Sequence, residues 1–178
     1  MQNDLVFFDI ETTGLDRDGT DSIIEIAAER VKDRQVVGEF TRLVKPLGPI
    51  HPDSQAIHGL DAGYLMMFGA PHGQALPEFA EFAKGATLVG HNIVDFDLRF
   101  VNRQLQSLQL PALTNAVFDT LPWSRKSLML GSYSMQSLAQ FFGIAYGGAH
   151  RAGRDVQITR EVFYKLVDRL LTNNNLNS

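Results

Sequence analysis

Two carboxylates lie two residues apart near the N-terminus, where Asp9 and Glu11 follow the apolar run LVFF. Successive side chains of a β-strand point to opposite faces, so Asp9 and Glu11 are predicted to share one face. The other face would carry Val6, Phe8 and Ile10. Two like charges at the end of a buried strand are costly unless a cation neutralises them. This spacing favours a metal-dependent enzyme, and the Thr-Thr-Gly segment that follows predicts a turn closely approaching a ligand.

Two later clusters contain further candidates. The segment GHNIVDFDLRF, residues 90–100, places Asp97 at the expected start of a helix, where the helix dipole favours a carboxylate. The segment GGAHRAGRDVQIT, residues 147–159, contains His150 and Asp155, five residues apart. Because five residues correspond to about 140° of helical rotation, the two can act together only if His150 lies in the loop before the helix. A His on such a Gly-rich loop suits a proton shuttle, and an ordinary surface His is the alternative.

In this order, FDIETTGLD, HNIVDFD and HRAGRD resemble the three motifs of the DEDD 3′–5′ exonucleases, in the subtype whose third motif contains His. This group includes the proofreading subunit of bacterial DNA polymerase III and ribonuclease T. The resemblance runs from Asp4 to about Leu171 and includes AIHGL at 56–60 and FDT at 118–120. It implies a ribonuclease H-like α/β fold with a mixed central sheet flanked by helices.

The same resemblance implies roles for individual residues. Two divalent ions, Mg²⁺ or Mn²⁺, would be held by Asp9, Glu11, Asp97 and Asp155, and His150 would be the general base. The terminal-nucleotide pocket would be lined by Thr12, Thr13, Gly14 and Leu15, with Leu15 wedged against the last bases. Further positions that flank substrate in the family match His58, Asn92 and Phe96.

The second motif departs from the usual pattern in one respect. The family more often has four residues between the His and the metal-binding Asp, whereas five separate His91 from Asp97 in this chain. Asp95 is therefore a rival ligand. We prefer Asp97 because Phe96 precedes it and Phe100 follows, as in the family pattern, and we interpret His91 as orienting the loop.

The resemblance implies a metal-dependent 3′–5′ exonuclease that releases nucleoside 5′-monophosphates from single-stranded ends, with DNA favoured over RNA. An imidazole has an ordinary pKa near 6.5 and can accept a proton from water at neutral pH. An RNA-trimming exonuclease of the same family is the second interpretation. A catalytically silent nucleic-acid-binding module is the third, and the presence of all five site residues argues against it.

The composition is that of a soluble globular protein, with 178 residues, 44% of them hydrophobic and 20% charged. We expect one exonuclease domain over residues 1–172 and a frayed polar tail over 173–178. The lack of cysteine excludes disulfides and thiolate zinc sites. No run is long enough for a membrane helix and MQNDLVFF lacks a basic signal region, so we expect a cytoplasmic protein.

Charge is distributed unevenly along the chain, although the net value is −4. Residues 1–95 carry 7 Lys/Arg against 15 Asp/Glu, whereas residues 96–178 carry 9 against 5. Basic residues gathered around one groove would contact phosphates despite the acidic total, and solvated helix faces explain them equally well. Both interpretations apply to Arg125 and Lys126, so the charge permits a polyanion partner without requiring one.

The elements predicted around these motifs begin with strands near 4–10, 22–31 and 36–44, which form an antiparallel meander. Helices are predicted at 74–84 and 96–108, with strands at 87–90 and 117–121 between and after them. Ser134 is expected to cap a helix that Gly143 ends, and a last helix runs to about Leu171. His51 and His72 are expected on the surface. Few residues follow the last helix, so we expect no polymerase tether in this chain, and a homodimer remains open.

Overall fold

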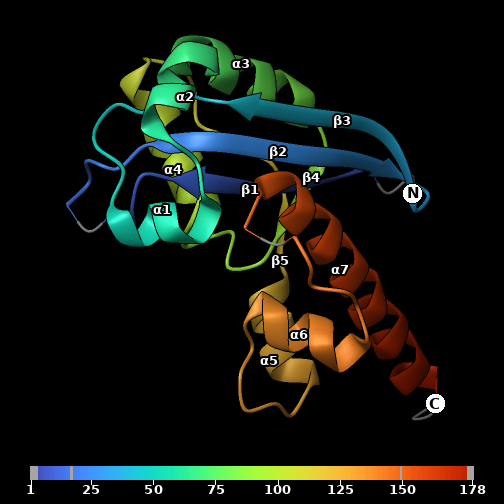
Figure 1. The fold of residues 1–178 in the computed structure, drawn as a ribbon. Helices are drawn as coiled ribbons and strands as arrows, with labels where there is room; N and C mark the ends of the chain where they lie inside the picture. The colour runs from blue at the N-terminus through green and yellow to red at the C-terminus, as the bar shows by residue number, and fades with distance from the viewer. Residues whose placement is uncertain (1–3, 17, 149, 176–178) are drawn as a thin grey trace.

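The computed structural model describes residues 4–16, 18–148 and 150–175. A five-stranded sheet has the strand order β3-β2-β1-β4-β5 and carries helices on both faces (Figure 1). The strands are β1 (Asp4–Thr12), β2 (Ile23–Lys32), β3 (Gln35–Leu43), β4 (Thr87–Gly90) and β5 (Val117–Asp119). The helices are α1 (Pro52–His58), α2 (Ala62–Phe68), α3 (His72–Ala83), α4 (Asp97–Ser107), α5 (Thr120–Ser127), α6 (Met135–Phe142) and α7 (Ala152–Asn175).

The sheet is mixed, as the sequence predicted. Strands β1, β2 and β3 pair antiparallel in chain order. The turn between β2 and β3 has Asp33 and Arg34 at φ 50° and 65°, the two left-handed residues that a tight hairpin turn requires. Strand β4 joins the other edge of β1 in parallel, and β5 extends the sheet in parallel to β4. The predicted α/β fold class is therefore confirmed.

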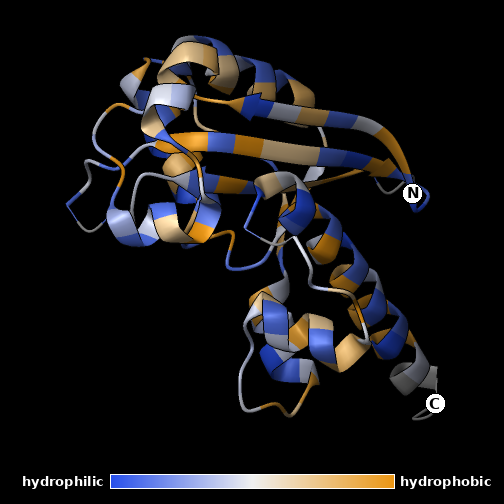
Figure 2. Cartoon of the chain, in the orientation of Figure 1, coloured by the Kyte–Doolittle hydropathy of each residue, from blue (hydrophilic) through white to orange (hydrophobic). Residues whose placement is uncertain are grey.

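Strand β1 lies in the middle of this sheet, and helices cover both of its faces. Val6, Phe8 and Ile10 belong to the core shared with α3 and α4, which confirms the predicted alternation. Phe7, on the opposite face, packs edge-on against Phe163 of α7 with 5.3 Å between ring centroids. Full burial of one such apolar side chain contributes about 1.5–3 kcal/mol to the free energy of unfolding. Figure 2 shows that β2, the neighbouring strand, is apolar over much of its length, so the strand that carries Asp9 and Glu11 lies within the core of the sheet.

Helices α5 and α6 pack against the middle of α7 and extend below the sheet in Figure 1. Leu138 of α6 is buried together with Val162 and Leu166 of α7. The predicted ends of α6 are confirmed, because the Ser134 side chain accepts from Ser137 N–H and Gly143 is left-handed. None of the helices in the described part of the chain has both the length and the apolarity to cross a membrane.

The sequence prediction omits three helices and misplaces one histidine. Helices α1, α2 and α5 have only seven or eight residues, too few to show a helical period. The surface position expected for His72 is wrong, because His72 begins α3 and is buried with its Nε2 3.0 Å from the Lys45 carbonyl.

The last helix is longer than the sequence predicted. It continues to Asn175, beyond the expected boundary at residue 172, and the rest of the expected tail lies outside the described residues. The predicted boundary followed from the polar character of the residues after the last apolar positions of the helix.

Candidate active site

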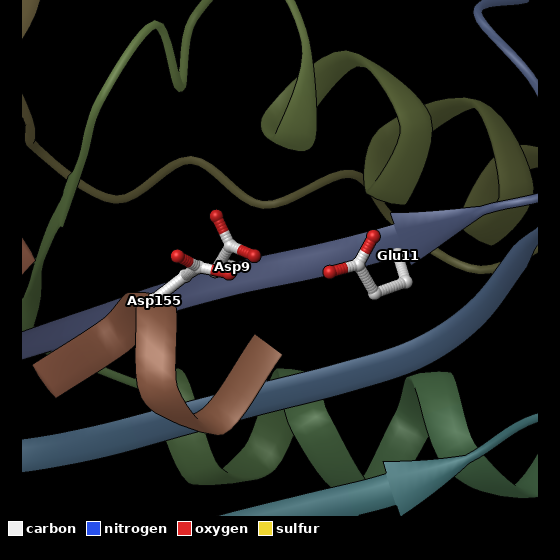
Figure 3. A group of neighbouring side chains, drawn as sticks. All are labelled: Asp9, Glu11 and Asp155. Atoms are coloured by element: carbon white, nitrogen blue, oxygen red, sulfur yellow. The ribbon is translucent and has the colours of Figure 1, made fainter. Parts of the chain in front are cut away.

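Three carboxylates from the two ends of the chain lie in one place. Each of Asp9, Glu11 and Asp155 offers a carboxylate oxygen, and these atoms lie within 4.8 Å of one another. Figure 3 shows Asp9 and Glu11 on β1 and Asp155 on the first turn of α7, all facing the same space. The two β1 carboxylates share one face, as the sequence predicted, and the structure shows that this face looks toward α7.

Asp97 approaches the same strand from the other direction. Strand β4 pairs only with Leu5–Phe7 of β1, so the edge of β1 is open farther along. There the Ile10 N–H donates to Asp97 Oδ1 at 3.2 Å. Asp97 is buried and Asp95 is exposed. Of the two rival positions, the structure brings Asp97 next to the carboxylates and leaves Asp95 facing solvent.

An ion pair between the buried Glu25 and the half-exposed Arg151 fixes the N-terminus of α7 beside this centre. Glu25 of β2 lies opposite Glu11 in the strand register, and like charges opposite each other destabilise a sheet. The Arg151 guanidinium donates twice to Glu25, at 2.7 and 3.1 Å, and the Ala152 N–H adds a third bond at 3.1 Å. Asp155 follows one turn later, so this pair determines where its carboxylate lies.

His150 lies in the loop before α7, as predicted. Its backbone has a left-handed φ of 68°, and its N–H donates to Asp155 Oδ2 at 2.7 Å. The imidazole is exposed and stands edge-on to Tyr146. A hollow of about 230 Å³ contains these groups. Its lining consists of Asp9, Ile10, Glu11, His91, Met135, Tyr146, His150, Asp155 and Thr159.

The carboxyl groups are difficult to ionise together in the protein alone. Burial, followed by the charges of Asp97, Asp155 and Glu11, raises the pKa of Asp9 well above its usual range. Burial and then Asp155 and Glu25 raise the pKa of Glu11 to about 8. Burial also raises the pKa of Asp97 to about 7 and raises that of Asp155. Burial is the largest cause of each shift, and neighbouring carboxylates add to it at Asp9, Glu11 and Asp97.

This donor set fits divalent cations. Every ligand atom is a carboxylate oxygen, the type that Mg²⁺ and Mn²⁺ prefer. A bound cation would stabilise the ionised carboxylates against both burial and mutual repulsion, so they would bind it in their ionised form. The electrostatics and the ligand chemistry therefore agree on a metal centre.

The turn after β1 is held together internally. The Thr12 hydroxyl donates to the Gly14 carbonyl at 2.7 Å, and the Thr13 hydroxyl donates to Asp21 at 2.8 Å. Both threonines are buried, whereas Leu15 is 61% exposed. A hollow of about 270 Å³ adjoins this turn, lined by Gly14, Leu15, Asp18, Asp21, His51, Asp53 and Ser54. Of the four predicted pocket residues, Gly14 and Leu15 line this hollow, and the two hydroxyls support the turn.

The remaining predicted substrate residues are distributed around the centre. His58 is buried near Thr12, and burial lowers the pKa of its imidazole. Phe96 is partly exposed and packs on Phe100 with ring centroids 5.0 Å apart. Asn92 has a φ of 60°, and its N–H donates to Asp119 Oδ1 at 2.9 Å. Asn92 lies in a different hollow from Leu15.

Sequence reasoning missed four residues of the centre, which are Glu25, Tyr146, Arg151 and Thr159. Thr159 comes one helical turn after Asp155, so the four-residue spacing signals its position. Glu25 and Arg151 are 126 residues apart, and no local pattern links them. Tyr146 comes from an irregular loop that carries no periodic signal.

Comparisons with known proteins place these features in context. Residues 6–163 match the RNase T family, described as exonuclease. The chain is 39% identical over 172 residues to a PolC-type DNA polymerase III of Caldanaerobacter subterraneus subsp. tengcongensis, covering 96% of this chain and 12% of that protein. It is 31% identical to the DNA polymerase III epsilon subunit of Aquifex aeolicus, covering 96% of this chain and 83% of the relative.

Two groups of solved structures share the fold. Escherichia coli exonuclease I in complex with a dA16 oligonucleotide superposes with a TM-score of 0.82 at 20% identity, over 96% of this chain and 43% of that one. Exonuclease X in complex with 5′ overhanging duplex DNA superposes with a TM-score of 0.72 at 25% identity, over 92% and 91%. The chain thus spans about 12% of the PolC-type relatives and most of exonuclease X.

Proposed function

Because the chain belongs to the RNase T family of DEDD-type 3′–5′ exonucleases with a ribonuclease H-like fold, we propose that it removes nucleoside 5′-monophosphates one at a time from single-stranded 3′ ends of DNA. The observation that carries this proposal is the cluster of Asp9, Glu11 and Asp155, with ligand oxygens within 4.8 Å of one another. A cluster of this charge is suited to a phosphodiester only when cations accompany it.

The proposed roles follow the positions of the side chains. Asp9, Glu11, Asp97 and Asp155 would hold two divalent ions, Mg²⁺ or Mn²⁺, which would neutralise the phosphodiester and lower the pKa of the attacking water. His150 would accept the proton of that water, since its imidazole is exposed in the same hollow as Asp9 and Asp155.

The terminal nucleotide is assigned to the turn after β1. Leu15 would wedge against the last bases, and its large exposed side chain supports this role. Thr12 and Thr13 would act by holding the turn, since their hydroxyls bond within it. His58 and Phe96 would border the same nucleotide.

DNA is favoured over RNA by the names of the related proteins. The relatives are DNA polymerase III components, and the similar exonuclease I and exonuclease X structures contain DNA. Polymerase activity is not proposed, because the chain covers only 12% of the PolC-type relative.

The test is a time course on 5′-labelled single-stranded DNA and RNA of matched sequence. We expect a ladder that shortens from the 3′ end with Mg²⁺ or Mn²⁺ and is absent with EDTA or in Asp9→Ala. The faster substrate decides between DNA and RNA. Binding without turnover in every metal, unchanged in Asp9→Ala, would instead indicate a silent nucleic-acid-binding module.

A further inference from the structure

A second hollow, of about 580 Å³, adjoins the carboxylate centre and has no role in the mechanism above. Its lining consists of His91, Asn92, Leu121, Arg125, Gly131, Ser132, Tyr133 and Ser134. His91 also lines the hollow of the carboxylate centre, so the two spaces share one wall. A single-stranded nucleic acid that left the centre on this side would pass His91 and enter the second hollow.

The shared wall is rigid and uncharged. The two ring nitrogens of His91 lie 2.9 Å from the Thr120 hydroxyl and 2.9 Å from the Tyr133 carbonyl. Burial lowers the pKa of the imidazole, which therefore stays neutral at physiological pH. His91 therefore connects the start of α5 to the loop that carries Ser132 and Ser134.

Arg125 is the one permanently charged side chain among the described residues that line this hollow. It lies in the last turn of α5, and its positive charge is close enough to His91 to help lower the pKa of that imidazole. Within the described parts of the chain it has no carboxylate within 4 Å, unlike Arg30, Arg103 and Arg151. A guanidinium with free donors and neighbouring hydroxyls matches the oxygens of a phosphodiester.

The hollow beside Leu15 has the opposite character. Its described lining includes Asp18, Asp21 and Asp53 and no Lys or Arg, so it favours a nucleoside over a phosphate. At a 3′ end the terminal nucleoside has no further phosphate, whereas the strand on its 5′ side has one at every nucleotide. The acidic hollow beside Leu15 therefore suits the terminal nucleoside. The hollow that contains Arg125 suits the phosphates on the 5′ side of the scissile bond.

We propose that the Arg125 hollow is a subsite for a backbone phosphate on the 5′ side of the scissile bond. The inference rests on the proposed function and goes beyond it by setting the direction of the strand, from the Arg125 hollow past His91 toward Leu15. Arg125 binds substrate and takes no part in bond cleavage.

The test compares two substrates that differ on the 5′ side. A labelled oligothymidylate carries many phosphates there, whereas the p-nitrophenyl ester of thymidine 5′-monophosphate presents the reactive phosphodiester and none. In Arg125→Ala the KM for the oligonucleotide should rise about tenfold, and the salt dependence of binding should fall by about one phosphate contact. Hydrolysis of the ester should be unchanged, and Arg125→Lys should retain the salt dependence.

Lys126 provides a matched control. It is the neighbouring cation, but its Nζ lies over the Trp123 ring at 5.7 Å and it does not line the hollow. Lys126→Ala should therefore behave as the wild type. Equal effects of the two substitutions, or equal loss on both substrates in Arg125→Ala, would overturn the subsite.

A wild-type protein that hydrolyses neither substrate would refute the proposed function but would not end the test of the subsite. Fluorescence anisotropy of the labelled oligonucleotide with Ca²⁺ then decides it. Weaker binding in Arg125→Ala than in Lys126→Ala supports the subsite, and equal binding refutes it.

Discussion

Asp97 and Asp95 are two residues apart in the sequence and differ sharply in environment. Asp97 is 5% exposed and accepts from the Ile10 N–H, whereas Asp95 faces solvent. We predict that Asp97→Asn lowers kcat at least about 100-fold, because loss of even an outer partner of a metal site typically costs 10–100-fold. Asn retains the bond from Ile10, so folding should be preserved.

Asp95→Asn is the matched control for this prediction and should keep full activity. Steady-state kinetics at saturating Mg²⁺ measures both variants. If Asp95→Asn were the inactive one, the assignment from the motif spacing would have to be reversed.

His150 is the residue whose role depends most on its loop. Its backbone N–H is bound to Asp155, and its ring remains free in the hollow of the carboxylates. We predict that His150→Gln lowers kcat by about 10²–10⁴-fold, the usual contribution of a general base. Mn²⁺ affinity, measured by calorimetry, should stay the same because the carboxylates are intact. Full activity with an unaltered pH profile would remove His150 from the mechanism.

At the scale of elements, two ion pairs join β2 to α7. Glu25 binds Arg151 before the helix begins, and Glu29 binds Arg160 more than two turns later, at 2.6 Å. Both glutamates are buried. The first pair lies beside Asp155 and the second does not. Substitutions in the two pairs therefore distinguish an effect on the position of Asp155 from an effect on the stability of the fold.

We predict that Glu25→Gln raises the Mg²⁺ concentration for half-maximal activity about tenfold, because it loosens the turn that carries Asp155. Glu29→Gln should lower the free energy of unfolding by about 1–3 kcal/mol and leave the Mg²⁺ concentration for half-maximal activity unchanged. Urea unfolding and metal titrations of activity measure the two effects. A Mg²⁺ requirement shifted equally in both variants would assign Glu25 a purely structural role.

The elements also show which parts of the fold sequence reasoning can predict. The strands of the meander, β4, and the ends of α6 carry local signals, namely alternation, a short apolar run, a Ser cap and a Gly stop. Helices α1 and α2 also carry local signals, namely the Gly59 stop and the Asp61 cap. With seven or eight residues, however, α1, α2 and α5 are too short to show a helical period. Their helical state depends on packing, such as Leu65 of α2 against Ile24.

The candidate site divides in the same way. The three sequence motifs identify the acidic residues because each motif is continuous in the chain. The buried partner Glu25, the wall formed by His91 and the hollow around Arg125 arise only when distant segments meet. Burial of His72 against Lys45 was missed for the same reason.

For the whole molecule, the carboxylate centre works against folding when no cation is present. Below about pH 4.5 Glu11 is protonated in both the folded and the unfolded chain. Above that value the unfolded chain ionises, whereas the folded chain keeps the proton until the pKa of about 8 is reached. The unfolded chain therefore binds fewer protons, and the free energy of unfolding falls as the pH rises through this window.

We predict that the protein in EDTA is less stable at pH 8 than at pH 5 and that Glu11→Gln reduces this difference. Urea unfolding at the two pH values measures it. Adding Mg²⁺ at pH 8 should restore stability, by about 2.7 kcal/mol at one hundred times its dissociation constant. Equal stability of the wild type at both pH values in EDTA would contradict the proposed electrostatic strain.

The centre takes two carboxylates from the first strand and one from the last helix. A nascent chain emerging from the ribosome displays Asp9 and Glu11 early but has no Asp155 until α7 is synthesised. A translation product that stops before α7 therefore contains all five described strands and lacks one of the three clustered carboxylates. We expect such a product to form the sheet without forming the complete carboxylate centre.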